Sequence, residues 1–246
     1  MILSIKELTS YTIEAKDGSV GQVESFLFDD QRWVLRYLVV DTKIWLPGRK
    51  VLIPTSNLEK PDAPTKAFPV DLTKEQVKNS PDIDTAKPVH RQHEIELYQH
   101  YNWFPYWNAP LEPMVTPYGF TDPELTTKTE ETDKDSDPHL RNFEEVKGYK
   151  IHAKDGHIGH IDDLLVDTED WKIRYIVIDT KNWMPGKKVI LPPYWIKEIN
   201  WSESKVVVDV SKDTVENSPE FDSRKPITRD YETILHEHYG WPVYWL

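Results

Sequence analysis

The chain contains two copies of a similar sequence. Residues 13–54 recur at residues 151–192, displaced by 138 positions without a gap, and the correspondence continues as far as the Tyr-Trp pairs at 106–107 and 244–245. The repeated unit spans about 100 residues, which is the size of a whole domain rather than of a solenoid repeat. Two such copies in one chain can pair about an approximate twofold axis, as the subunits of a homodimer do. We therefore expect two paired domains, with any function located in features that both copies keep or in what their pairing creates.

The repeats divide the chain into two domains and a linker. We assign residues 1–107 to the first repeat, residues 108–140 to the linker and residues 141–246 to the second repeat. The linker is rich in proline, threonine and acidic residues, and it lacks the periodicity of a helix or a strand. We expect an extended acidic connection, and an acidic docking segment for a basic partner is the alternative.

Charge and composition narrow the classes of function. The net charge of −12 repels phosphate backbones and anionic membrane surfaces, which argues against nucleic acid as a partner. The absence of cysteine excludes disulfides and thiolate metal sites and fits a reducing compartment. No segment reaches the roughly 20 apolar residues that a membrane span requires. These features predict a cytoplasmic protein without a membrane span.

Within each copy, the sequence is typical of short strands joined by tight turns. An Asp-Gly pair at 17–18 and another at 155–156 each predict a hairpin. Gly21 and Gly159 follow in the next strand, where a glycine indicates a bulge or a close approach of two backbones. Several strands at this spacing predict a small barrel that closes its own edges.

The strongest strand runs from residue 33 to residue 41 and again from residue 171 to residue 179. Alternation predicts one face made of Trp33, Leu35, Tyr37 and Val39, and Leu38 and Val40 make the other face apolar at its far end. We expect this end to be covered from both sides. Further strands are predicted at 50–54, 188–192 and 205–209, and the counterpart of the last, at 66–71, is weakened by Pro69.

Two short helices and an aromatic arm follow the strands in each copy. Residues 73–78 begin with a Thr-x-x-Gln capping box, and Ser211 keeps the cap in the second copy. The second helix is predicted at 91–100 and at 229–238, and each runs into an arm that contains two tryptophans. The arms have too little apolar area to fold alone, so we expect each to pack on its own barrel or on that of the neighbouring copy. The fold class is therefore mainly β (α+β).

Together these motifs resemble the PRC-barrel family. The resemblance rests on the Ile/Val-Gly-x-Val/Ile run after Lys-Asp-Gly, on Trp-x-x-Arg-Tyr-Leu/Ile-Val-Val/Ile-Asp-Thr, and on Trp-Leu/Met-Pro-Gly-Arg/Lys-Lys-Val. The family includes the cytoplasmic barrel of the photosynthetic reaction centre H subunit and a domain of the ribosome maturation factor RimM. The resemblance covers residues 5–107 and 143–246 and is closest to bacterial proteins with two such barrels. It implies two tandem small β-barrels that bind other proteins and have no known catalytic centre.

Six pairs of titratable residues, kept in both copies, are the candidates for catalysis. They are Asp17/Asp155, Asp29/Asp167, Arg36/Arg174, Asp41/Asp179, Glu94/Glu232 and His100/His238. Catalysis would require an acid, base or nucleophile to converge in a pocket, whereas these aspartates stand where turns and strand ends need them. Arg36 and Arg174 are expected to pair with a carboxylate. No phosphate-binding loop, dinucleotide fingerprint or nucleophile elbow is present in the sequence. We predict no catalytic residue and no cofactor.

A group of histidines in the second copy is the candidate for a metal site. His152, His157 and His160 lie close to Asp162 and Asp163 in the sequence. The first copy has no histidine at the corresponding positions. Solvent-facing hairpin residues explain this pattern more simply, so we predict that no metal is bound.

The aromatic loops are the candidates for contact with a partner. Tryptophan and basic residues interleave at 45–50 and at 183–188, in loops that also contain proline and glycine. The predicted partner-binding residues are Trp45, Arg49, Trp183, Lys187, Trp103 and Trp241. We therefore expect a non-catalytic protein-binding or assembly module. The alternatives are an RNA-associated factor, which the basic and aromatic residues of these loops would suit, and an enzyme or metal-binding protein.

Overall fold

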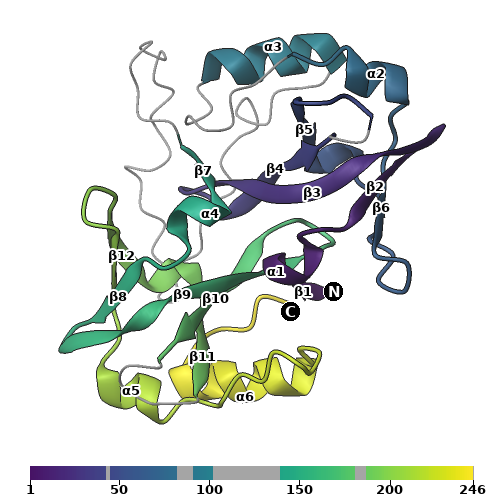
Figure 1. The fold of residues 1–246 in the computed structure, drawn as a ribbon. Coiled ribbons are helices and arrows are strands. Elements are labelled where there is room, and N and C mark those ends of the chain that lie inside the picture. The colour runs from purple at the N-terminus through teal and green to yellow at the C-terminus, as the bar shows by residue number, and fades with distance from the viewer. Residues whose placement is uncertain (43–44, 82–90, 102–138, 181–186, 246) are drawn as a thin grey trace.

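The chain folds into two antiparallel-rich sheets and several short helices. The computed structural model describes residues 1–42, 45–81, 91–101, 139–180 and 187–245. In Figure 1 the two sheets lie side by side in the middle of the molecule, with α2 (Lys74–Lys78) and α3 (Arg91–Tyr101) at one end and α5 (Lys212–Glu216) and α6 (Arg229–Tyr239) at the other. The fold is therefore mainly β, as predicted.

The first sheet has six strands. Five follow the order β5-β4-β3-β2-β6, which are Lys50–Pro54, Val34–Asp41, Gly18–Asp29, Thr12–Ala15 and Ala67–Pro69. The sixth is β7 (Leu140–Asn142), which pairs with β3 although it follows the linker. The expected barrel closure is not among the pairings of the described strands, which run as an open path.

The second sheet has seven strands. Six follow the order β11-β10-β9-β8-β13-β12, which are Lys188–Leu191, Ile173–Asp179, Gly156–Asp167, Lys150–Ala153, Lys205–Val208 and Ile196–Asn200. The seventh is β1 (Ile2–Ser4), which pairs with β9. Short helical segments join the strands: α1 (Ile5–Leu8), the 3-10 turns η1 (Thr55–Asn57) and η3 (Pro193–Trp195), and α4 (Phe143–Val146).

Each half gives its first strand to the sheet of the other half. Ile2 pairs with Asp167 and Ser4 with Leu165, while Leu140 pairs with Asp29 and Asn142 with Leu27. The two registers are offset by the same 138 residues as the sequence repeat. The sequence did not predict these strands, because three residues carry no periodicity. The boundaries at residues 107 and 141 divide the sequence repeats, whereas the sheets cross them.

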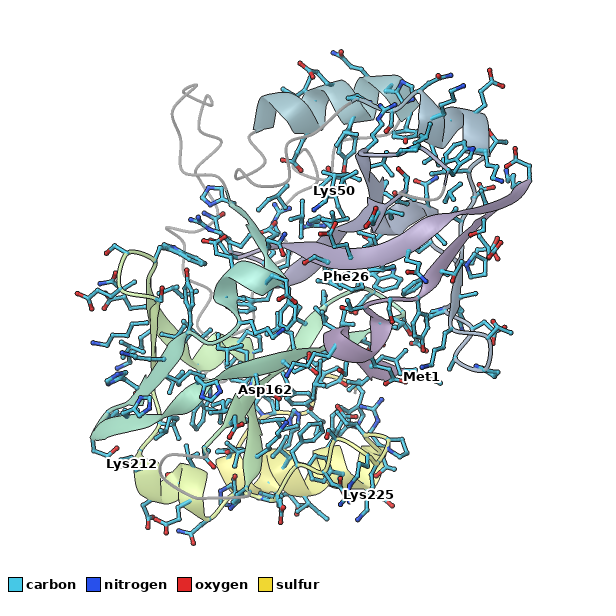
Figure 2. The ribbon with its side chains drawn as sticks, viewed as in Figure 1. Met1, Phe26, Lys50, Asp162, Lys212 and Lys225 are labelled. Carbon is cyan, nitrogen blue, oxygen red and sulfur yellow. The ribbon has the colours of Figure 1, made fainter. Side chains whose placement is uncertain are left out.

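The turns that precede β4 and β10 also join the halves. The backbone N–H of Leu35 donates to the carbonyl of Trp171 at 2.9 Å, and the N–H of Ile173 donates to the carbonyl of Trp33 at 2.7 Å. One cluster of buried side chains runs through both halves, and Phe26 of β3 lies in it between the two sheets (Figure 2). The halves therefore share one hydrophobic core.

The glycine positions in β3 and β9 are confirmed as close approaches. A Cβ atom on Gly21 would lie 2.2 Å from the carbonyl oxygen of Asp41, and one on Gly159 would lie 2.2 Å from that of Asp179. Both glycines have a positive φ. Gly21 pairs with Ile13 of β2 and Gly159 with Ile151 of β8, and in each pair of strands the register shifts directly after this residue. Only glycine fits where the long strand bends across its neighbour.

The predicted faces of the strongest strand were partly wrong. Trp33 and Trp171 are buried as expected, but they lie in turns with φ of 52° and 60°, before β4 and β10 begin. In β4, a register shift leaves Arg36 between the paired residues Leu35 and Tyr37. Leu35 then packs in the shared core, while Tyr37 packs in a smaller cluster with Leu97 of α3. A bulge changes which face each residue occupies, and alternation alone cannot place it.

The predicted helices form with the expected caps. Thr73 and Gln76 make both bonds of the capping box at α2, and Ser211 accepts from the N–H of Thr214 at α5. Gly240, with φ 68°, ends α6 in the left-handed conformation. Within the described part of the chain, no helix has both the length and the apolar character of a membrane span.

Candidate functional site

The aspartates of the two hairpins hold helices. The carboxylate of Asp17 accepts from the backbone N–H of Lys74 at 2.7 Å, and that of Asp155 accepts from the N–H of Lys212 at 2.8 Å. Each carboxylate therefore lies at the first turn of a short helix, where an acid is stabilising. The expected turn position is correct, but the bond goes to a helix 57 residues away rather than to the turn itself.

The aspartates that end β3 and β9 accept hydrogen bonds from the following turns and pair with arginine. Asp29 accepts from the backbone N–H groups of Gln31 and Arg32, and its second oxygen lies 3.2 Å from Arg36. The equivalent pair, Asp167 and Arg174, also lies 3.2 Å apart. The expected pairing of both arginines with carboxylates is confirmed. Asp41 and Asp179 lie at the ends of β4 and β10.

The histidines near the ends of α3 and α6 tie these helices to their neighbours. His100 Nε2 lies 3.3 Å from the carbonyl of Gln76, and His238 Nε2 lies 2.9 Å from that of Thr214. Since a carbonyl only accepts, the imidazole donates in both pairs. This use of the side chain is structural in both halves.

A buried tyrosine–glutamate pair repeats beneath α3 and α6. The Tyr37 hydroxyl donates to Glu94 at 2.9 Å, and the Tyr175 hydroxyl donates to Glu232 at 2.8 Å. Both glutamates are only 2% exposed. A buried carboxylate requires donors to offset its desolvation, and the tyrosine on the strand supplies one in each half. The sequence identified the glutamates but missed their tyrosine partners.

In the second half this pair belongs to a larger network. Tyr244 donates to Glu232 at 2.6 Å, Arg229 lies 3.0 Å from its other oxygen, and His236 Nε2 lies 3.1 Å from the Tyr175 hydroxyl. Tyr175 has one hydroxyl proton, so it can donate either to Glu232 or to His236 at one time. Burial lowers the pKa of His236 and raises that of Tyr175. The network thus contains interacting groups whose pKa values are shifted. Such shifts are found both in functional sites and in structural ion clusters.

Equivalent buried threonines hold the two ends of the aromatic loops together. Thr42 donates to the carbonyl of Arg49 and Thr180 to that of Lys187, both at 2.6 Å. Trp45 is partly buried against the core, and the ammonium of Lys74 lies 5.7 Å from its ring centroid. The predicted partner-binding residue Trp183 lies outside the described residues, as does Trp103.

The basic residues of these loops bind their own helices. The Arg49 guanidinium donates to the carbonyls of Lys78 and Ser80, and the Lys187 ammonium donates to the carbonyl of Glu216. These carbonyls lie at the carboxyl ends of α2 and α5, where a cation is stabilising. Both side chains therefore hold the loop to the helix, and their predicted role toward a partner remains a prediction.

The second aromatic arm packs on its own half. Trp241 is 7% exposed and lies against Tyr239, Trp195 and His236, with ring centroids 4.2, 5.1 and 5.5 Å away. The indole of Trp241 is therefore an internal aromatic contact in this half. The first arm, with Trp103, falls among the residues that the structure does not describe.

The histidines of the second hairpin do not gather as metal ligands. The rings of His152 and His157 lie 5.2 Å apart, and burial together with nearby lysines lowers the pKa of both. Over the described ranges, no group of three histidine or acidic side chains could hold a metal ion. Asp163 is instead bound by Ser4 and by the N–H of Lys6 at 3.2 Å, and its pKa is raised by burial. This aspartate thus joins β9 to β1 and α1, the segment that the first half contributes to the second sheet.

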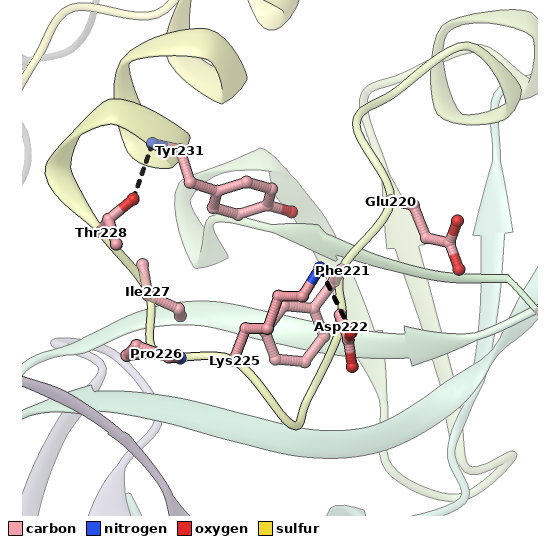
Figure 3. A pocket seen from close by; sticks show the side chains of 8 residues that line it. All are labelled: Glu220, Phe221, Asp222, Lys225, Pro226, Ile227, Thr228 and Tyr231. Carbon is pink, nitrogen blue, oxygen red and sulfur yellow. Dashed lines mark hydrogen bonds and ion pairs between the residues drawn. The ribbon is translucent and has the colours of Figure 1, made fainter.

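A pocket of about 340 Å³ lies where α6 begins (Figure 3). Its walls include Phe221, Ile227 and Tyr231, and the Lys225 ammonium lies 3.7 Å from Asp222 at its edge. None of the residues that line it is one of the titratable candidates kept in both copies. The pocket is therefore separate from the network around Glu232.

Comparison with known proteins supports the fold resemblance. Residues 140–215 match the PRC-barrel domain family. No curated protein matches the chain. The matched range begins at β7 and ends within α5, so it covers all seven strands of the second half of the chain. Residues 140–215 of this chain therefore belong to the PRC-barrel domain family.

Proposed function

We propose that this chain is a non-catalytic protein-binding or assembly module built from two PRC-type barrels. The observation that carries the proposal is the structural use of the titratable groups that both copies keep. Asp17 and Asp155 hold helices, Asp29 holds a turn and Arg36, and His100 donates to a helix carbonyl. These bonds give each group a structural role within its own half, which supports a non-catalytic module.

We further propose that the two halves form one unit by pairing about a pseudo-twofold axis. The reciprocal pairing of β1 with β9 and of β7 with β3 supports this arrangement, as do the reciprocal bonds between the Trp33 and Trp171 turns. The unit then carries the aromatic-loop sequence twice, at 45–50 and at 183–188. A module of this kind suits a partner that is itself paired or repeated.

The loops provide the test. We expect a chain with Trp45→Ala and Trp183→Ala to lose a partner captured by the wild-type chain from its native host, because tryptophan is among the residues that most often contribute strongly to binding at interfaces. Glu198→Ala, a change of an exposed residue on β12, is the matched control and should retain the partner. Equal capture by the loop variant and the wild type would contradict the assignment to these loops.

The second candidate is an RNA-associated role. The stacking of Lys74 on Trp45 places a cation beside an aromatic ring, which is the combination that single-stranded RNA contacts use. The net charge of −12 opposes it. Retention on heparin that weakens steeply with salt would favour this candidate over the protein-binding role.

A further inference from the structure

The C-terminal arm is bound to the second half as a peptide is bound in a groove. The Tyr244 hydroxyl donates to Glu232 at 2.6 Å, and the Pro242 carbonyl accepts from His236 Nδ1 at 2.9 Å. The Tyr244 ring centroid lies 4.1 Å from the guanidinium carbon of Arg174, and the Trp245 centroid lies 4.1 Å from that of Arg229. The groups that receive the arm form an aromatic socket, defined as Arg174, Tyr175, Arg229, Glu232 and His236.

Bonds among the socket's own residues join the elements that form it. Tyr175 stands on β10 and Glu232 on α6, and their hydrogen bond of 2.8 Å joins these two elements directly. Arg229 binds the same carboxylate from within α6 at 3.0 Å. With the arm in place, Tyr175, Glu232 and His236 are each at most 4% exposed. A receptor held by its own bonds keeps its shape when the occupant changes, which is the condition for recognition rather than simple packing.

The chemistry of the socket selects a tyrosine followed by a tryptophan. Glu232 accepts a hydroxyl proton at its buried oxygen, so a phenylalanine would leave that carboxylate with one donor fewer. Arg174 lies over the Tyr244 ring, and Arg229 lies over the rings of both Tyr244 and Trp245, all at cation–π distance. The chain contains Tyr-Trp in both repeats, at 106–107 and 244–245.

We propose that the aromatic socket is a recognition site for a Tyr-Trp peptide, filled in cis by the chain's own arm and able to accept the same arm from a second copy of the chain. The contacts of Pro242, Tyr244 and Trp245 with the socket are made by side chains or by the Pro242 carbonyl, so an arm from another copy can form the same contacts. Gly240, with its left-handed φ of 68°, separates helix from arm and is the point where the chain can change direction. Exchange of identical segments is a low-cost route to association. This inference concerns a different surface from the aromatic loops, so it can fail without affecting the proposed function.

The first test supplies the arm as a free peptide. The probe is a labelled peptide of residues 240–245, and the receptor is the full-length chain with Tyr244→Ala and Trp245→Ala, whose fold is checked by circular dichroism and thermal unfolding. We expect saturable binding, and we expect the intact chain to bind at least about tenfold more weakly because its own arm competes at high effective concentration. A peptide with phenylalanine at the Tyr244 position should bind about tenfold more weakly than the native sequence.

Two results would overturn the recognition site. One is the absence of peptide binding to a variant that is folded, and the other is equal binding of the tyrosine and phenylalanine peptides. If the double substitution unfolds the chain, Tyr244→Ala alone serves as the receptor, because it frees Glu232 and Arg174 for the peptide and leaves only the Trp245 ring on Arg229.

The second test asks whether another copy supplies the arm. The Tyr244→Ala/Trp245→Ala chain offers a socket, and a chain with Arg229→Ala offers an arm whose own socket lacks the cation under Trp245. We expect sedimentation of the mixture at tens of micromolar to show a 1:1 complex that neither chain forms alone. No complex in a mixture whose receptor does bind the free peptide would overturn the second copy as the source of the arm.

Discussion

The two halves repeat the same backbone but complete it differently. The second sheet contains β12 (Ile196–Asn200), whereas in the first half the corresponding residues make only isolated bridges, Leu58 with Val70 and Asp62 with Ala67. Pro61 stands where the second half has Ile199, and Pro69 stands where it has Val207. Proline has no N–H for the ladder, so the first half loses this strand while it keeps its turns. The two halves thus share the glycines and the helix caps, and they differ at the sheet edge that β12 forms in the second half.

The same comparison applies beneath the two long helices. Both halves bury a tyrosine–glutamate pair, but the residue four positions after the glutamate is Tyr98 in the first half and His236 in the second. Only the second half therefore places an imidazole against the buried tyrosine hydroxyl. The backbone of the repeat therefore does not determine whether an imidazole lies at this site.

The largest expected effect concerns the two segments that pair with the sheet of the opposite half, β1 with α1 and β7 with α4. Phe143→Ala and Ile5→Ala remove equivalent, fully buried side chains of α4 and α1, and we expect losses of about 3–5 and 2–5 kcal/mol of unfolding free energy. Because each segment packs on the opposite half, Phe143→Ala should raise amide exchange most in β3 and Ile5→Ala most in β9. Exchange that rises only within the mutated half would contradict the reciprocal pairing.

A comparable effect is expected where the long strands bend. Gly21→Ala and Gly159→Ala each place a Cβ atom 2.2 Å from a backbone carbonyl oxygen, and we expect each to lower the unfolding free energy by roughly 2–4 kcal/mol. Gly148→Ala is the control, because its Cβ would meet nothing within 4 Å and it bears only the left-handed strain of about 1–2 kcal/mol. Denaturant titration measures all three, and a control as damaging as the other two would show that contact is not the cause.

A smaller effect is expected at the buried hydrogen bonds. Tyr37→Phe and Tyr175→Phe each remove one donor from a buried glutamate, which should cost about 1–3 kcal/mol of unfolding free energy. The matched pair measures how far the two sites remain equivalent. A neutral result in both halves would mean that another donor replaces the hydroxyl.

The smallest effect is a dependence on pH at the tyrosine–glutamate pair of the second half. Burial lowers the pKa of His236 in the folded chain, so its contribution to stability is present above the ordinary imidazole pKa of about 6.5 and is lost as the pH falls below it. Its charged and titratable neighbours are Glu232, Arg229, Tyr175 and Tyr244. His236→Tyr, which introduces the residue of the first half, should reduce the fall in unfolding free energy between pH 7.5 and 5.

His152→Gln is the control for that measurement. The pKa of His152 is also lowered by burial, but this residue lies in β8, away from the tyrosine–glutamate pair. It should remove its own share of the pH dependence and leave that of His236. An unchanged slope in His236→Tyr would place the acid sensitivity elsewhere.

Local features of the fold followed from particular residues in the sequence. The Asp-Gly hairpins, the glycines at the close approaches and the Thr73 and Ser211 caps were all predicted, because each requirement is met by a residue and its near neighbours. The candidate site was found only in half. Glu94 and Glu232 were identified, but Tyr175, Arg229, His236 and Tyr244 were not, since they come from separate elements that only the packed fold brings to one carboxylate.

The sequence by itself determined that this chain is rich in β-strands and repeats one pattern at a spacing of 138 residues, because the repeat and the strand periodicity can be read along the chain. Only the tertiary structure decided that β1 belongs to the second sheet and β7 to the first, and that the Tyr244–Trp245 arm rests on its own half. The reason is physical. A three-residue strand finds its partner through hydrogen bonds and buried contacts with residues more than 100 positions away, and near-equivalent halves offer it two such partners.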